Sequence, residues 1–228
     1  MDSCPTRFKA IAMNKYKHIL KNREVAAQKL LDVIPMQKLK DEDWKIVAVS
    51  KGGLVVGSHL IGKNDNDIDF LFSEPIMAPH NDECEIARVS ETEEIVINED
   101  LVKSFEIKFD YIYGEAHRKH EERILSCMYR FRKGEHFFDV KDKVILLVDD
   151  GAETGMKFMT ALKTILAKKP KAVYIAVPVI PQDVLESLEP FTDDIFYLHD
   201  IGDYVETSLY YDEFEDISDS EIEKYLGA

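Results

Sequence analysis

The sequence has few cysteines, and their placement excludes the patterns that cysteine clusters form. Only three occur in 228 residues, at Cys4, Cys84 and Cys127, and no two of them share the CxxC spacing of metal or redox motifs. An odd number of scattered cysteines, without a recognisable signal peptide, is typical of a reducing compartment. We therefore expect a cytoplasmic protein.

Positive charge is also scarce. Lys and Arg number 29 against 44 Asp and Glu, which gives a formal net charge of −15. Binding to nucleic acid or to an anionic membrane would require basic side chains that neutralise phosphates. We expect neither as a partner, although a locally basic pocket is compatible with this balance. The apolar runs are also too short to span a bilayer.

What the chain does contain is enough apolar sequence for a core. Hydrophobic residues make up 45% of the 228 positions, and this length and proportion suit one sizeable α/β core. We predict a single domain over residues 1–228, with an N-terminal arm at 1–21 and an aromatic, acidic tail at 199–228. The sequence leaves the oligomeric state open, and a homodimer is one option.

The most informative stretch is residues 143–166, which reads KVILLVDDGAETGMKFMTALKTIL. Residues 144–148 are continuously apolar and stop at two carboxylates, Asp149 and Asp150. This pattern is typical of a strand that is buried on both faces of a parallel sheet. A compact loop follows, and then a helix whose apolar side chains recur at helical spacing until residue 166.

A strand, a loop of small residues and the start of a helix together form a binding site for a phosphate. The amide groups at the helix N-terminus and the helix dipole favour an anion, and glycine permits its close approach. Adjacent carboxylates would repel a phosphate, but they suit a pair of sugar hydroxyls. One anion and one diol side by side describe a ribose 5-phosphate.

A second site of the same kind is predicted nearer the N-terminus. Residues 46–50 read as a buried strand, which runs into the loop Ser50-Lys51-Gly52-Gly53 and then into an apolar helix at 54–61. The loop would present a second set of amide groups to an anion. Its sequence alone is weakly specific, because a pair of glycines after a strand also makes an ordinary tight turn.

Further strands and helices alternate along the chain. Apolar runs predict the remaining strands at 68–72, 172–179 and 195–198, and helical spacing predicts the remaining helices at 22–34, 113–133 and 181–188. This alternation predicts a doubly wound, mainly parallel five-stranded sheet that binds its ligand at the carboxyl ends of the strands. Residues 73–100 read as an irregular segment that contains hairpin strands at 86–89 and 95–97. A long segment of this kind is typical of a lid.

Acidic and histidine residues outside the two loops allow other interpretations. The run from Asp65 to Asp69 lacks the glycine and glutamate that an EF-hand needs at positions six and twelve. A metal-dependent nucleotidyltransferase is a stronger alternative, since Gly57-Ser58 precedes Asp67 and Asp69, and Asp110 would be a third acid. The simpler reading makes 68–72 a core strand. His117 and His120 could share a metal, but a charged, exposed helix face explains them better.

The motif VILLVDDGAETG resembles the signature by which type I phosphoribosyltransferases bind 5-phosphoribosyl-1-pyrophosphate (PRPP). Residues 98–101, 176–179, 210–214 and 218–222 extend the resemblance to a bacterial group of phosphoribosyltransferases whose bases are mostly unassigned. The likeness covers roughly residues 22–226, and its central motif is the specific part. It implies a core parallel sheet, a mobile hairpin lid at 73–100 and a small C-terminal hood at 199–228.

The implied reaction is the transfer of the phosphoribosyl group from PRPP to a nucleobase, a purine being favoured, with release of pyrophosphate in nucleotide salvage. Mg²⁺ is the implied cofactor, and Asp149 and Asp150 would hold it through ribose hydroxyls or water. The catalytic residues would be Glu153, Asp149 and Asp150, of which Glu153 stands where the 6-oxopurine enzymes have an Asp beside purine N7. The residues implied to bind PRPP are Asp149, Asp150, Gly151, Ala152, Glu153, Thr154, Gly155, Met156 and Lys157. Those implied to bind pyrophosphate are Ser50, Lys51, Gly52 and Gly53.

Two positions depart from the pattern of the family. Lys157 stands where a second hydroxyl residue is common, so the phosphate loop gains a cation and loses a donor. Ser73-Glu74 stands where related sequences carry Arg-Lys, which weakens the case for pyrophosphate binding unless Lys51 or Arg88 compensates. A PRPP- or nucleotide-binding regulator without turnover is therefore an alternative from another functional class.

Overall fold

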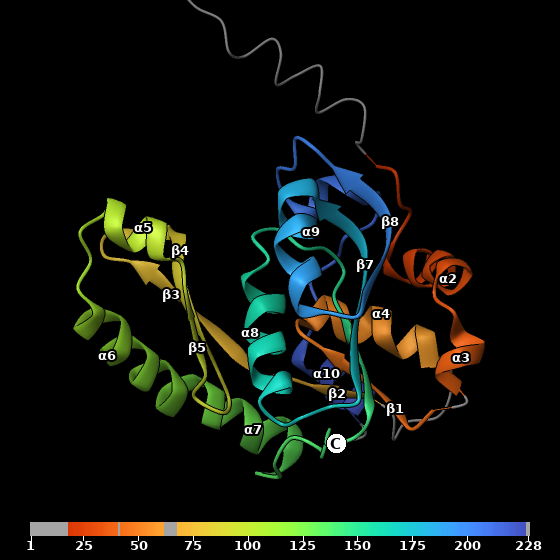
Figure 1. The fold of residues 1–228 in the computed structure, drawn as a ribbon, viewed down its shortest axis with the longest axis horizontal. Helices are drawn as coiled ribbons and strands as arrows, with labels where there is room; N and C mark the ends of the chain where they lie inside the picture. Colours follow the sequence, from red (N-terminus) through yellow and green to blue (C-terminus); the bar gives the residue numbers. More distant parts are fainter. Residues whose placement is uncertain (1–17, 41, 62–67, 227–228) are drawn as a thin grey trace, which may run out of the picture.

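A parallel sheet of five strands forms the centre of the protein, as predicted. The computed structural model describes residues 18–40, 42–61 and 68–226 (Figure 1). The strands follow one another across the sheet in the order β2-β1-β6-β7-β8, and each adjacent pair is parallel. Their bounds are β1 Trp44–Ala48, β2 Ile68–Phe70, β6 Val144–Val148, β7 Ala172–Pro181 and β8 Asp194–Ile201.

Helices cover both faces of this sheet, which explains why its central strands show no polar alternation. All five residues of β6 are buried. Ile145 and Leu147 belong to a core cluster with α8 (Met156–Leu166) and α9 (Gln182–Leu188). Leu146 and Val148 face the other way, into a cluster with α2 (Arg23–Val33) and α4 (Lys51–Ile61). Successive strand residues point to opposite faces, so a strand packed on both sides must be apolar throughout.

Residues 73–100 form a second sheet, and the prediction of an irregular segment is wrong. An antiparallel sheet in the order β3-β4-β5 contains the two predicted hairpin strands and a third strand that the sequence did not indicate. The strands are β3 Ser73–Ala78, β4 Asn81–Ser90 and β5 Ile95–Ile97. Pro75 is compatible with β3 because this strand lies at an edge of the sheet, where a missing N–H leaves no central partner unsatisfied.

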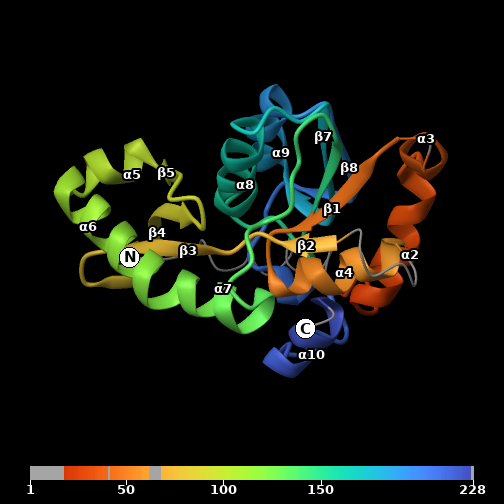
Figure 2. The same cartoon turned by 90° about the horizontal axis from the view of Figure 1, so that it is seen from below.

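The antiparallel sheet and a long helical stretch make a layer beside the parallel sheet (Figure 2). The helices are α5 Glu99–Ser104, α6 Phe109–Lys119, the π-helical turn η2 His120–Ile124 and α7 Leu125–Arg132. Lys133 and Gly134 have φ of 53° and 83°, so the stretch ends where glycine predicted its stop. Its first residue is Phe109 rather than 113. Buried residues of β3, β4 and α7 share a core cluster with the parallel sheet, which ties the two layers together.

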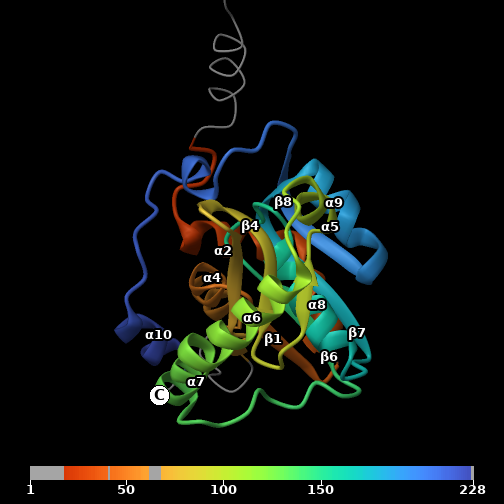
Figure 3. The ribbon, with the colours of Figure 1, turned by 90° about the vertical axis from the view of Figure 1, so that its left-hand side faces the viewer.

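The two ends of the described chain meet beside the sheet. A parallel bridge joins Leu20 to Tyr211, next to the short helix η4 Thr207–Tyr210. The chain then passes α2 and α4 and ends in α10 Asp219–Leu226, which contacts α4 and α7 (Figure 3). The remaining helices are α3 Met36–Lys40 and η3 Glu189–Phe191. Most of the predicted N-terminal arm lies outside the described residues. Within the described ranges, no helix has the length and apolar character needed to cross a membrane.

Arg132, the last residue of α7, joins the two layers by its charge. Its side chain is 8% exposed, donates to the carboxylate of Glu91 and lies 3.8 Å from Asp69. Asp69 also accepts hydrogen bonds from the backbone N–H groups of Phe70 and Phe138. Burial raises the pKa of both carboxyl groups, and the charge of Arg132 opposes that rise.

Replacing Arg132 with Met leaves two buried carboxylates without their cation. We expect the free energy of unfolding to fall by about 3–5 kcal/mol at neutral pH. The loss should shrink as the pH falls toward about 4, because raised pKa values let the folded state take up protons before the unfolded state does. Urea denaturation at several pH values measures this, with the exposed Arg118→Met as a control that should stay unchanged. A loss that is the same at every pH would contradict the assignment.

Candidate functional site

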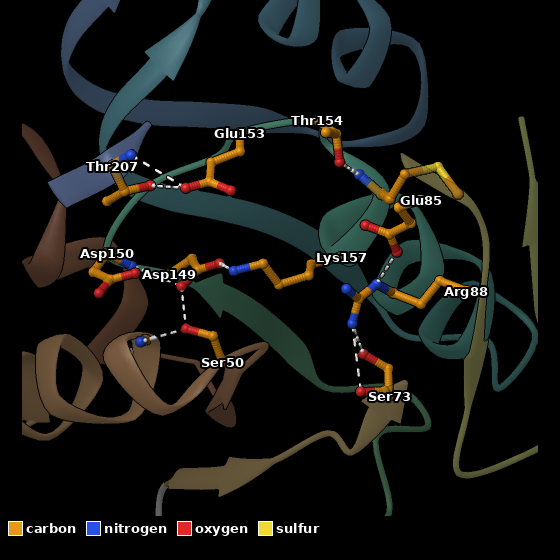
Figure 4. Close-up of polar contacts among 12 residues, drawn as sticks. Ser50, Ser73, Glu85, Arg88, Asp149, Asp150, Glu153, Thr154, Lys157 and Thr207 are labelled. Atoms are coloured by element: carbon orange, nitrogen blue, oxygen red, sulfur yellow. Dashed lines mark hydrogen bonds and ion pairs between the residues drawn. The ribbon is translucent and has the colours of Figure 1, made fainter. Parts of the chain in front are cut away.

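The two predicted loops lie side by side at the carboxyl ends of the parallel strands. Ala48 pairs with Val148 in the register of β1 and β6, so the residues that follow each strand are neighbours (Figure 4). The hydroxyl of Ser50 accepts a hydrogen bond from the N–H of Gly53 at 2.9 Å and donates one to Asp149. Ser50 therefore caps α4 and connects its N-terminus to the end of β6.

The loop that was predicted at 50–53 is in fact the first turn of a helix. α4 begins at Lys51 instead of Leu54. A Cβ atom on Gly53 would lie 2.2 Å from the carbonyl oxygen of Val148, so the helix start packs directly on β6. A pair of glycines after a strand predicts a loop, but here Gly53 permits close contact between a helix and a strand.

Asp149 faces the space between α4 and α8. Its side chain is fully buried, and one carboxylate oxygen accepts hydrogen bonds from Ser50 and from the N–H of Asp150 at 2.8 Å. The other oxygen lies 3.0 Å from the ammonium group of Lys157 (Figure 4). Burial alone would lower the pKa of Lys157, but the charges of Asp149 and Asp150 outweigh it and raise the pKa. The ammonium is therefore charged at neutral pH.

Asp150 points to the other face of the sheet, toward the chain ends. Its Oδ2 accepts a hydrogen bond from Nε of Arg23 at 2.7 Å, and both side chains are nearly buried. Arg23 also donates to the carbonyl of Glu215 at 2.8 Å and stacks 3.9 Å from the ring centre of Phe214. Burial and the charge of Asp149 raise the pKa of Asp150 to about 7, against the opposing charge of Arg23. Of the two carboxylates, only Asp149 faces the loop.

Gly151, Ala152, Glu153 and Thr154 form the predicted loop, and Gly155 begins the turn into α8. Gly155 has a φ of 71°, a conformation that glycine adopts without strain. The hydroxyl of Thr154 accepts from the N–H of Met156 at a long 3.4 Å. The first turn of a helix carries amide groups without partners inside the helix, and these are the expected ligands of an anion.

Glu153 is exposed and held from the tail of the chain. One of its carboxylate oxygens accepts hydrogen bonds from the N–H and the hydroxyl of Thr207, at 3.2 and 3.1 Å (Figure 4). Tyr204 in turn bonds to the Thr207 hydroxyl at 2.9 Å. A pocket of about 570 Å³ opens beside this group. Its lining residues are Glu153, Thr154, Pro181, Gln182, Asp183, Glu186, Gly202, Tyr204 and Val205.

The two described acids of the nucleotidyltransferase alternative, Asp69 and Asp110, have unrelated surroundings. Asp69 is buried against Arg132, and both of its oxygens accept backbone hydrogen bonds. Asp110 is exposed in the first turn of α6, and Asp67 lies outside the described residues. The two histidines also have separate contacts, His120 with the carbonyl of Glu91 and His117 with the side chain of Glu121. The described residues therefore give this alternative no support.

Three residues at the site were not predicted from the sequence. Arg23 is the first residue of α2, where the helix dipole disfavours a positive charge. An arginine at such a position is a weak signal in the sequence that a carboxylate elsewhere in the chain pairs with it. Thr207 and Asp219 had no such signal. Asp219, in α10, lies 3.0 Å from the ammonium of Lys51 and also pairs with Arg130. Their roles depend on the path of the tail, which no local pattern encodes.

Comparison with known proteins supports the predicted resemblance. No family model matches the chain. A protein of Mycobacterium tuberculosis, named "putative phosphoribosyl transferase" in strains CDC 1551 and H37Rv, is 22% identical over 181 residues, which are 79% of this chain and 41% of that protein. The chain thus spans about two fifths of these curated relatives. A solved structure from Thermus thermophilus, TT1426, superposes with a TM-score of 0.72 at 24% identity, covering 91% of this chain and 97% of that one. The predicted likeness to phosphoribosyltransferases and the predicted α/β fold are therefore both confirmed.

The contact between Gly52 and Asp150 predicts a sharp limit on side-chain size at the start of α4. A Cβ on Gly52 would lie 1.8 Å from Oδ2 of Asp150, whose position is fixed by Arg23. We expect Gly52→Ala to lower the free energy of unfolding by about 1–3 kcal/mol. Gly114, inside α6, has nothing within 4 Å of its would-be Cβ, so Gly114→Ala should raise stability by about 0.5–1 kcal/mol. Chemical denaturation of both variants checks the contrast, and equal effects would refute it.

Proposed function

We propose that the chain is a phosphoribosyltransferase that transfers the phosphoribosyl group of PRPP to a nucleobase and releases pyrophosphate. The surroundings of Asp149 support this proposed reaction most directly. This buried carboxylate lies between the N-termini of α4 and α8, so a diol-binding group has an anion-binding helix start on either side. PRPP has the matching order of groups: a 5-phosphate, a ribose diol and a pyrophosphate.

Each part of the site has a defined task in this reaction. The loop from Gly151 to Lys157 binds the 5-phosphate through its amide groups. Asp149 accepts a hydrogen bond from a ribose hydroxyl, and the ammonium group of Lys51 binds the pyrophosphate. As the bond from C1 to the pyrophosphate oxygen breaks, a ring nitrogen of the base forms the new bond to C1. Positioning and charge stabilisation, rather than a nucleophilic side chain, supply the acceleration.

Asp149 and Asp150 do not fit a directly coordinated Mg²⁺. Carboxylate oxygens suit this ion in general, but Asp149 already faces Lys157 and Asp150 already faces Arg23. Asp149, which faces the loop, fits an ion that is held through ribose hydroxyls or water, as the resemblance implies, whereas Asp150 is enclosed by Arg23 and the start of α4. Mg²⁺ bound in this way would neutralise the leaving pyrophosphate.

Glu153 is the residue we assign to the base. Thr207 fixes its carboxylate at the rim of the 570 Å³ pocket, which is large enough for a planar heterocycle. From there the carboxylate can take or share the proton of a ring nitrogen, and Tyr204 offers a ring on which a base can stack. A purine in nucleotide salvage, in the cytoplasm, is the acceptor we favour.

A protein that binds PRPP without turnover is the second candidate. Ser73 and Glu74 stand where the related sequences carry two cations, and Glu74 lines the space next to Lys51. A carboxylate at this point opposes the binding of pyrophosphate. Pyrophosphate release separates the two candidates: incubation with PRPP, Mg²⁺ and each purine and pyrimidine base yields pyrophosphate with one base for the enzyme and with none for the regulator.

Asp149→Asn tests the proposed position of the ribose. The amide loses the charge-assisted hydrogen bond to the sugar hydroxyl, so we expect the Kd of PRPP to rise about tenfold or more. Calorimetric titration measures it. Asp100→Asn, an exposed change in the first turn of α5, serves as the control and should bind like the unchanged protein. If both variants bind PRPP equally well, the ribose does not lie on Asp149.

Glu153→Gln tests the role of the base-side carboxylate. Glutamine can still accept both hydrogen bonds from Thr207 but cannot take up a proton. We expect kcat for pyrophosphate release to fall about 100-fold or more while the Kd of PRPP stays the same. Glu122→Gln changes an exposed carboxylate of η2 that lies outside this pocket, and it should retain its activity. A fall in PRPP affinity with no change in kcat would place Glu153 in binding instead.

A further inference from the structure

A small cavity lies between the parallel sheet and the antiparallel sheet, next to the core that they share. Its volume is about 230 Å³, and it opens beside the start of α4 and the carboxyl ends of β1 and β2. Three of its lining residues, Lys51, Arg88 and Lys157, carry a positive charge. The polar lining residues are Ser50, Lys51, Ser73, Glu74, Arg88 and Lys157.

Three separate elements bring these cations to the cavity. Lys51 begins α4, Lys157 is the second residue of α8, and Arg88 comes from β4 in the antiparallel sheet. The positive charge of Arg88 lowers the pKa of Lys157, although the two aspartates outweigh it, so the two cations are close enough to interact. Cations that converge on one cavity match a ligand with several negative charges.

Arg88 is the most rigidly placed of the three. Its side chain is 10% exposed, and its Nε donates to Glu85 at 2.7 Å. One terminal nitrogen, Nη1, donates to the hydroxyl and the carbonyl of Ser73, at 3.1 and 3.4 Å (Figure 4). The contacts made with described residues leave Nη2 for a ligand. A fixed guanidinium has the fork geometry that phosphate oxygens accept.

Each of the three cations pairs with a carboxylate, but they differ in how many hydrogen-bond donors remain available to an incoming anion. Lys51 pairs with Asp219, Lys157 with Asp149 and Arg88 with Glu85. An ammonium is a point charge that its carboxylate largely neutralises. A guanidinium spreads its charge over five donors, so one carboxylate on Nε leaves donors free to bind. Arg88 is thus the cation that gains most from a second anion.

We infer that Arg88 binds the terminal phosphate of the pyrophosphate group, in place of the two cations that residues 73 and 74 lack. This assignment rests on the proposed function and adds a residue to it. Ser73 then has a task of its own, because its hydroxyl holds the guanidinium in position. Lys51, at the start of α4, binds the phosphate nearer the sugar, so the cavity prefers a diphosphate to a single phosphate.

Inorganic pyrophosphate and ribose 5-phosphate are the probes that test this. Arg88→Gln should weaken pyrophosphate binding about tenfold to a hundredfold, and should leave ribose 5-phosphate binding unchanged within about twofold. Arg88→Lys should fall between. Arg118→Gln is the matched control, since Arg118 also pairs with a glutamate three residues earlier but lies exposed on α6. Isothermal calorimetry gives each Kd.

In the single variant Arg88→Gln, Glu85 loses its partner, and its unpaired charge could disturb β4. A double variant controls for this effect. Glu85→Gln with Arg88→Gln removes both charges at once and should show the same selective loss of pyrophosphate affinity. Unchanged pyrophosphate binding in the folded double variant overturns the role of Arg88, while PRPP binding by the unaltered protein would leave the proposed function standing. Failure of the unaltered protein to bind PRPP overturns both.

Discussion

Two neighbouring carboxylates are buried at the end of β6, and burying such charges is costly unless cations lie close to them. The protein supplies those cations from different directions. Lys157 reaches Asp149 from α8, and Arg23 reaches Asp150 from α2, on the other face of the sheet. The placement of both helices is therefore coupled to the charge at one strand end. Among the described residues, Oδ2 of Asp149 pairs with the ammonium of Lys157 alone, so a ligand hydroxyl can bind there, whereas Asp150 is enclosed by Arg23 and the start of α4.

The antiparallel layer does more than cover the parallel sheet. Its β3 and β4 pack into the same core as the main strands, and Arg132 links the layers through Asp69 and Glu91. These contacts give the layer a defined position, which Arg88 needs in order to point into the cavity between the sheets. A segment that fluctuated freely would not hold a guanidinium in one place. Movement of the layer relative to the parallel sheet would change the width of this cavity directly.

The central strand motif was predictable because its signals are local. An apolar run, two acids, a small loop and a helix occur within 24 consecutive residues, so strand β6, α8 and the position of Asp149 followed from the sequence. Strand β3 was missed because Pro75 and its irregular register with β4 mask the alternation of a strand. Gly52 and Gly53 were read as a loop because sequence does not distinguish a flexible glycine from one that lets a helix touch a strand.

The contacts of the chain ends were beyond prediction for a different reason. Arg23 bonds to Asp150, 127 positions away, and to Glu215, 192 positions away. Closing loops of this length carries an entropy cost that only the finished core repays. The position of Arg23 therefore depends on the segment that includes Phe214, against whose ring its guanidinium stacks. A variant that lacks Phe214 and Glu215 would retain the sheet residues yet hold Arg23 less firmly, so the charge balance at the strand end depends on this distant segment of the chain.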